Sequence, residues 1–96
     1  MTLKQIKKIF KDNSEEHGHF ERVQIPLSHR PDLHAFIMLD RLFPDESHMV
    51  ISARNCEIFL SVRLQDISRY IKEDKVIDLI RCGVSYDGDF RLTMFV

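Results

Sequence analysis

The chain has 96 residues, a length that fits one domain with a small hydrophobic core. Its 44% hydrophobic and 30% charged residues are typical of a globular protein and exclude a disordered chain. The formal net charge of −1 excludes both a domain that is basic overall, as most nucleic-acid binders are, and a strongly acidic mimic of DNA. Any electrostatic function must therefore come from a local patch.

The first expected element is an amphipathic helix over residues 2–12, with Thr2 as its N-cap. Apolar side chains recur on one face, and lysines follow at helical spacing on the opposite face. Such a stripe either contacts phosphates or keeps the outer face of the helix soluble. Glu15 and Glu16 follow directly and favour the second interpretation. The stripe consists of Lys4, Lys7, Lys8 and Lys11.

Residues 20–27 alternate between apolar and polar side chains, which predicts a strand that ends near Pro26. Residues 32–43 fit a helix, with Pro31 tolerated in its first turn. The unbroken apolar run 35–39 within this segment would also suit a buried strand. We favour the helix because Leu, Met and Ala have weak β-propensity.

The middle of the chain predicts a β-hairpin with strands 49–53 and 56–62 and a turn at Arg54-Asn55. In the second strand, Ile58, Leu60 and Val62 are expected to point inward. The alternate residues Glu57, Phe59 and Ser61 are expected to point away from the core.

The last third, residues 64–96, reads as two short helices, a stop at Gly83 and a second hairpin. Residues 72–74 interrupt the helical pattern, either as a kink or as a true turn. The hairpin pairs residues 84–86 with residues 90–96 around an Asp87-Gly88 turn. On its second strand we expect one face to carry Leu92, Met94 and Val96, and the other to carry Arg91, Thr93 and Phe95.

These elements predict a single compact α+β domain over residues 1–96. We expect a small antiparallel sheet of about five strands, with about three helices packed mainly on one face. The expected core comprises Ile6, Phe10, Val23, Ile25, Phe36, Ile37, Val50, Ile58, Leu60, Ile67, Ile77, Ile80, Leu92 and Met94.

The order of the last elements, two helices followed by a hairpin, is also that of winged-helix nucleic-acid binders. A recognition helix should offer Arg, Asn, Gln or Ser to base edges. The second helix instead begins with Glu73 and Asp74, and the hairpin turn carries Asp87 and Asp89. These carboxylates would repel a phosphate backbone, so nucleic acid is disfavoured as a partner.

The chain shows no motif for catalysis, a metal or a cofactor. His17 and His19 flank Gly18, but they do not stand at a recognised ligand spacing with the cysteines. Cys56 and Cys82 are expected to be buried thiols rather than a disulfide. Because the chain begins with a lysine-rich amphipathic segment and its longest apolar run is residues 35–39, we expect no signal peptide, no membrane segment and a cytoplasmic location.

The leading hypothesis is therefore a non-enzymatic module for protein–protein interaction. Inhibitors, immunity proteins and accessory factors of phages or other mobile elements share this size, charge and lack of motifs. Aromatic side chains on the outward faces of strands are candidate anchors, and a second copy of the chain is one candidate partner. The alternative is a nucleic-acid-binding module that uses the lysine helix 2–12 or the C-terminal helix–hairpin unit. The candidate protein-binding residues are Phe59, Tyr86, Phe95 and Arg91.

Overall fold

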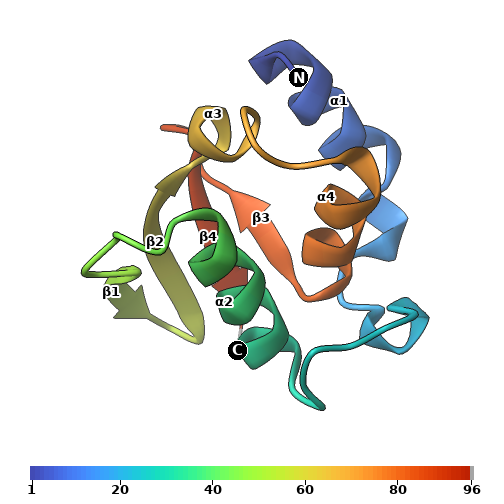
Figure 1. Cartoon of the computed structure of the whole chain (residues 1–96), viewed down its shortest axis with the longest axis horizontal. Helices are drawn as coiled ribbons and strands as arrows, with labels where there is room; N and C mark the ends of the chain where they lie inside the picture. The colour runs from blue at the N-terminus through green and yellow to red at the C-terminus, as the bar shows by residue number, and fades with distance from the viewer. Residues whose placement is uncertain (96) are drawn as a thin grey trace.

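The structure, a computed structural model, describes residues 1–95 and shows an α+β domain (Figure 1). Within these residues, one antiparallel sheet of four strands packs with four α-helices, so the sheet has one strand fewer and the domain one helix more than expected. The elements are α1 (Leu3–Asp12), the 3₁₀ turns η1 (Ser14–Glu16) and η2 (Phe20–Arg22), α2 (Pro31–Leu42), β1 (Val50–Arg54), β2 (Glu57–Arg63), α3 (Leu64–Ile67), α4 (Glu73–Arg81), β3 (Val84–Tyr86) and β4 (Arg91–Phe95).

The strands lie in the order β1-β2-β4-β3, and every neighbouring pair is antiparallel. The strands β2 and β4 are therefore central, and β1 and β3 form the edges. Across the centre, Ile58 pairs with Met94 and Phe59 pairs with Thr93. The register of β2 then shifts before Arg63, which pairs with Arg91.

Helix α1 is confirmed, and its start follows from a capping box. The Thr2 hydroxyl accepts a hydrogen bond from the Gln5 amide at 3.1 Å, and the Gln5 side chain accepts one from the Thr2 amide at 2.7 Å. Ile6 and Phe10 are buried, whereas the lysines of the opposite face are exposed.

Residues 20–27 do not form the expected strand. Residues 20–22 form the 3₁₀ turn η2, and the Val23 amide donates to the Phe20 carbonyl within it. The Leu27 amide donates to Nδ1 of His34 on α2 instead of to a neighbouring strand. Because local turns and a helix side chain satisfy this backbone, the segment joins no sheet, and Ile25 is 82% exposed rather than part of the core.

Residues 31–42 are helical, as favoured over a strand, and Pro31 occupies the first turn of α2. Ala35 and Leu39 are fully buried, and Met38 nearly so.

The first hairpin turns one residue later than expected. Arg54 pairs with Glu57, so the turn residues are Asn55 and Cys56, both with positive φ. Two consecutive left-handed residues make the type of turn that matches the twist of paired strands. The prediction that Cys56 is buried is wrong, because the turn exposes it, and Val50 is 44% exposed because β1 is an edge strand.

The C-terminal hairpin is confirmed for β3 and β4, and Val96, also expected in its second strand, lies outside the described residues. Its turn is built differently from the expectation. Gly88 does not have positive φ; Phe90 does, at 62°. The Asp87 carboxylate accepts hydrogen bonds from the amides of Asp89 and Arg91 at 2.9 and 3.0 Å and organises the loop. Before it, Gly83 ends α4 with φ of 91°, as its position predicted.

The core lies between the helices and one face of the sheet, and α2 and α4 cover that face in Figure 1. Of the predicted core, Phe36, Ile37, Ile58 and Ile77 are half-buried, and Ile25 and Val50 are exposed. The remaining predictions are confirmed as buried: Ile6, Phe10, Val23, Leu60, Ile67, Ile80, Leu92 and Met94.

Candidate functional site

Side chains on β2 and β4 alternate between the helix-covered face of the sheet and the opposite face. Leu60, Leu92 and Met94 point into the core and are fully buried. Their neighbours along each strand point the other way, onto what we call the open face. The charged and aromatic residues of the open face are Arg54, Glu57, Phe59, Arg63, Arg91 and Phe95.

Phe59 and Phe95 are the apolar residues of the open face. Neither belongs to the core or packs against it, Phe95 is 55% exposed, and Phe59 is half-buried. Phe59 pairs with Thr93, which stands two residues before Phe95. The two phenylalanines are therefore diagonal neighbours on adjacent central strands, and the Cα atoms of such neighbours are about 7–8 Å apart. They therefore lie at neighbouring positions on the same face of the sheet, with Thr93, which is 3% exposed, directly opposite Phe59. We call the two phenylalanines the aromatic surface.

Two further side chains, an arginine and a histidine, border this aromatic surface. The Arg54 guanidinium lies 5.9 Å from the centre of the Phe59 ring, and the His17 ring lies 6.1 Å from that of Phe95 in a T-shaped arrangement. Beside Phe95 there is also a cleft of about 410 Å³, whose lining includes His17, Arg81 and Cys82. The aromatic surface is thus continuous with a concave feature at the end of β4.

The open face carries more positive than negative charge. Arg54, Arg63 and Arg91 stand against the single carboxylate of Glu57, although the whole chain has a formal net charge of −1. Arg63 and Arg91 face each other directly across the β2–β4 ladder. In the part of the chain that the structure describes, neither takes part in an ion pair.

Tyr86 does not lie on the open face, so its predicted outward orientation is wrong. It pairs with Leu92 and packs on the helix-covered side, with its ring 5.2 Å from that of Phe10 and 6.2 Å from that of Phe90. The structure thus brings Phe59, Phe95 and Arg91 together and excludes Tyr86.

Arg54 and Arg63 join the open face without having been predicted there. The alternation along residues 57–63 already places Arg63 on the side of Phe59, so the signal was present in the sequence. The position of Arg54 could not be predicted without the correct turn at Asn55 and Cys56, because that turn places Arg54 in β1 opposite Glu57.

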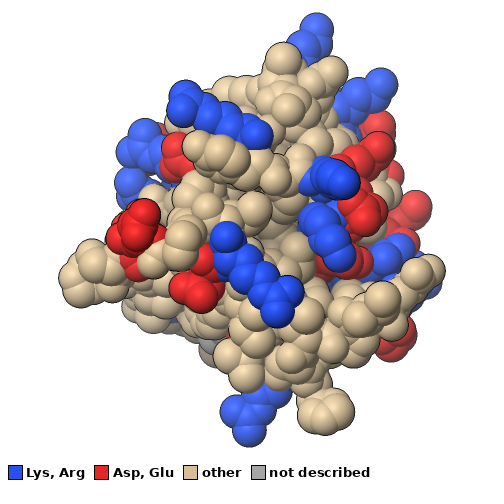
Figure 2. Space-filling view, in the orientation of Figure 1, with Lys and Arg blue, Asp and Glu red and all other residues tan. Residues whose placement is uncertain are grey.

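The lysine stripe lies on α1, away from the open face. All of its four members are exposed, and the Lys7 ammonium lies 5.0 Å from the centre of the Phe90 ring. On the side of the molecule that Figure 2 shows, basic and acidic side chains are interspersed rather than gathered into a patch of one sign. The stripe is Lys4, Lys7, Lys8 and Lys11.

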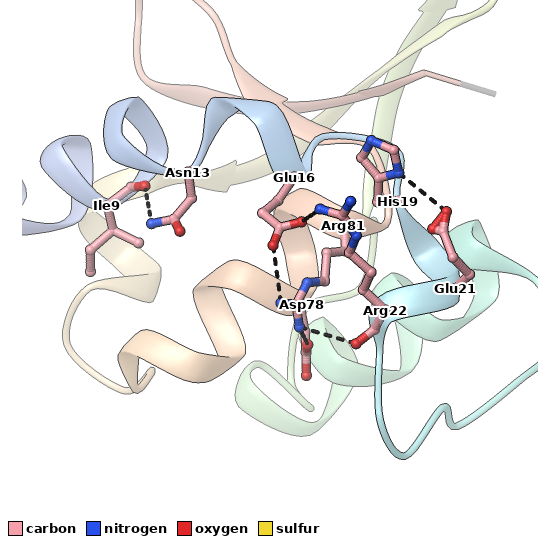
Figure 3. Close-up of polar contacts among 8 residues, drawn as sticks. All are labelled: Ile9, Asn13, Glu16, His19, Glu21, Arg22, Asp78 and Arg81. Carbon is pink, nitrogen blue, oxygen red and sulfur yellow. Dashed lines mark hydrogen bonds and ion pairs between the residues drawn. The ribbon is translucent and has the colours of Figure 1, made fainter.

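A separate network of charged residues fastens the loop after α1 to α4 (Figure 3). The Glu16 carboxylate pairs with Arg22 and, at 3.3 Å, with Arg81, and Arg81 also pairs with Asp78 at 3.3 Å. The hydrogen bond from Arg22, aided by Arg81, holds the pKa of Glu16 below its ordinary value. Every charge in the network has a partner, which is typical of a structural role.

The histidines and cysteines do not converge. His19 contacts Glu21 at 3.2 Å, whereas His17 lies against Phe95, and in residues 1–95 no three His, Cys, Asp or Glu side chains form a group that could hold a metal ion. Cys82 is 3% exposed, and burial raises the pKa of its thiol to about 12. The thiol of Cys82 is therefore protonated at neutral pH.

No protein-family model, curated protein or solved structure matches this chain. None of the helices in the described part of the chain has the length and apolar character needed to cross a membrane. The open face, with its two phenylalanines and three arginines, is the strongest candidate site that the geometry offers.

Proposed function

We propose that this protein is a protein-binding module that docks the open face of its sheet on a partner protein. The observation that carries the proposal is the position of Phe59 and Phe95, which lie on the two central strands but outside the core. We further propose that it acts in the cytoplasm as an inhibitor, immunity protein or accessory factor, and not as an enzyme.

Two phenylalanines on one open sheet face are suited to the centre of an interface. Each ring offers a large apolar surface, and strands fix the rings in place so that little conformational entropy is lost on binding. Phe95 in particular exposes 55% of its surface in the free protein. Arginine is also among the residue types that most often dominate the binding energy of a protein–protein interface. The arginines of the open face favour a partner with an acidic surface.

Replacement of both phenylalanines by serine tests this proposal. Because Phe59 and Phe95 lie outside the core, we expect the double variant Phe59→Ser/Phe95→Ser to remain folded. Loss of two anchor residues should weaken binding at least tenfold, about 1.4 kcal/mol or more. The measurement is isothermal titration calorimetry with a partner first captured from the native host, and circular dichroism verifies the fold.

The matched control is Ile25→Ser. Ile25 is an apolar residue that is 82% exposed in the loop before α2 and does not belong to the sheet. This variant should bind the partner as the wild type does. Equal binding by the wild type and the double variant would contradict the proposal, as would unfolding of the double variant, which would place the phenylalanines in the core.

The same double variant also tests whether the partner is a second copy of the chain. If sedimentation shows a dimer for the wild type and a monomer for Phe59→Ser/Phe95→Ser, the open face joins two copies. The edge strands supply a competing surface for self-association, because their outer backbone groups are available for pairing. A dimer that survives the substitution would therefore use an edge.

The alternative function, binding of nucleic acid, has one supporting observation. The four lysines of α1 are exposed on one helix, and none takes part in an ion pair in the described part of the chain. Salt-sensitive retention on heparin that disappears when Lys4, Lys7, Lys8 and Lys11 become Glu would favour it. The C-terminal unit is less suited, because α4 begins with Glu73 and Asp74.

A further inference from the structure

We infer that Arg63 and Arg91 form a carboxylate-binding site on the open face, and that this site receives an acidic side chain of the partner protein. The inference rests on the proposed function, since it names the chemistry that the docking surface recognises. It concerns the end of the open face where β2 leads into α3.

The first observation is the direct opposition of two like charges. Arg63 and Arg91 are partners in the antiparallel β2–β4 ladder. Like charges at directly opposite positions destabilise a sheet, whereas opposite charges stabilise it. The repulsion between the two arginines therefore lowers the stability of the free protein. An anion bound beside them would attract both guanidinium groups and offset this repulsion.

The second observation is a donor without an acceptor. The Nε–H of Arg91 is shielded from water and has no hydrogen-bond partner within residues 1–95. Buried donors are almost always satisfied in folded proteins, and each exception calls for an explanation. Because this atom is shielded, a carboxylate on the open face would meet the outer N–H groups of the guanidinium, and the Arg91 side chain would have to move before its Nε–H is paired.

Two other arginines of the chain, by contrast, are paired with carboxylates. Arg22 and Arg81 share the Glu16 carboxylate, and Arg81 also pairs with Asp78. The guanidinium groups of Arg63 and Arg91 take part in no ion pair in the described residues. Their backbone amides donate to the carboxylates of Asp66 and Asp87, each at 3.0 Å.

The chemistry of guanidinium explains why a carboxylate fits. Its N–H groups form a planar fork that binds the two oxygens of a carboxylate, and each such charge-assisted bond is about twice as strong as a neutral one. A carboxylate is the anion expected here because the proposed partner is a protein, and the open face holds its cations at its two ends. Arg54 lies beside Phe59, and Arg63 pairs with Arg91 beyond it.

The distance along β4 defines the shape of the ligand. Arg91 and Phe95 are four residues apart on one strand, about 13 Å at a strand's rise of about 3.3 Å per residue. An extended partner segment would therefore place an acidic side chain and an apolar side chain about four residues apart. The probe is the hexapeptide acetyl-Glu-Glu-Ser-Ser-Phe-Leu-amide, and its control peptide carries Gln in place of both Glu.

The experiment is a titration of the ¹⁵N-labelled full chain followed by NMR. The acidic peptide should shift the Nε–H signal of Arg91 and the backbone amide of Arg63, and the Gln peptide should bind at least tenfold more weakly. The variant Arg63→Gln/Arg91→Gln should lose the difference between the two peptides. Its matched control, Lys4→Gln/Lys8→Gln, removes the same charge from α1 and should keep that difference.

Three results would overturn the inference: equal binding of the two peptides to the wild type, an unchanged preference in Arg63→Gln/Arg91→Gln, or an equal loss in the lysine control. Binding of the oligonucleotide dT12 at the arginine pair without binding of the acidic peptide would also overturn it. Arg63→Gln alone, a change at an exposed residue, repeats the test if the double variant is unstable. If the arginine variant still binds the captured partner but Phe59→Ser/Phe95→Ser does not, this inference fails and the proposed function stands.

Discussion

Among residues 1–95, three residues other than glycine have positive φ, and all of them stand at hairpin turns. Asn55 and Cys56 form the first turn with φ of 50° and 66°, and Phe90 stands at the end of the second turn with φ of 62°. Asparagine adopts this conformation at little cost, but a residue with an ordinary β-carbon costs about 1–2 kcal/mol there. The strain of the first turn is therefore concentrated at Cys56.

We expect Cys56→Gly to raise the free energy of unfolding by about 0.5–1 kcal/mol. Glycine removes the β-carbon from a left-handed residue, and Asn-Gly is the favoured pair for this turn. Urea denaturation measures the change. Ser52→Gly, on β1 of the same hairpin and without positive φ, should instead lower stability. A loss of stability in Cys56→Gly would show that the turn does not strain this residue.

At the residue scale, alternation along the strands assigned most side chains to the correct face. Phe59, Phe95 and Arg91 point away from the core, as the sequence predicted. Tyr86 was misplaced because its strand has only three residues, too few for alternation to define a face. Its face is determined by the register with β4, where it pairs with Leu92, and by the ring of Phe10 on α1.

At the element scale, the loop before α2 depends on one buried histidine. His34 is 2% exposed, and its Nδ1 accepts a hydrogen bond from the Leu27 amide at 2.9 Å. Burial lowers the pKa of His34 below its ordinary value of 6.5, and Lys75 and Arg41 act in the same direction against Asp78. A proton on Nδ1 would also remove the acceptor that holds Leu27.

We therefore expect the protein to lose stability as the pH falls from about 6.5. The pKa of His34 is lower in the folded than in the unfolded state, so the unfolded state binds more protons in this range and the free energy of unfolding falls with pH. One proton gives a slope of at most about 1.4 kcal/mol per pH unit. Urea denaturation at several pH values between 7.5 and 5.5 measures this slope.

The variant His34→Gln should show a smaller slope over this range, whereas His29→Gln, at an exposed position, should keep the slope of the wild type. The lower limit of pH 5.5 avoids Glu16, whose lowered pKa affects stability only below its ordinary value of 4.5. A slope that is the same in His34→Gln and the wild type would contradict this account of the loop.

Elements with strong local signals were predictable from the sequence. The periodicity of α1 and α4, the Thr2 cap and the stop at Gly83 all appear in the structure. Residues 20–27 were mistaken for a strand because their alternation matches that of a strand, although no neighbouring strand pairs with them. Whether such a segment joins a sheet depends on contacts outside it, here the side chain of His34, seven residues after Leu27.

At the scale of the whole molecule, the sheet order decides which residues form the candidate site. The C-terminal strand β4 inserts between β2 and β3, which brings Phe95 beside Phe59 and Arg91 opposite Arg63. This pairing spans residues more than 25 apart in sequence, and no local pattern encodes it. The sequence therefore suggested individual side chains of the site, whereas the topology joins them into one surface.

The central claim is that the open face is the surface that meets a partner. The most direct test is the NMR footprint of the captured partner on the ¹⁵N-labelled protein. The account predicts that the amide signals of β2 and β4 around Phe59, Arg91 and Phe95 change most, and that those of α1 and Tyr86 do not. A footprint centred on the lysines of α1 or on the helix-covered side would contradict it.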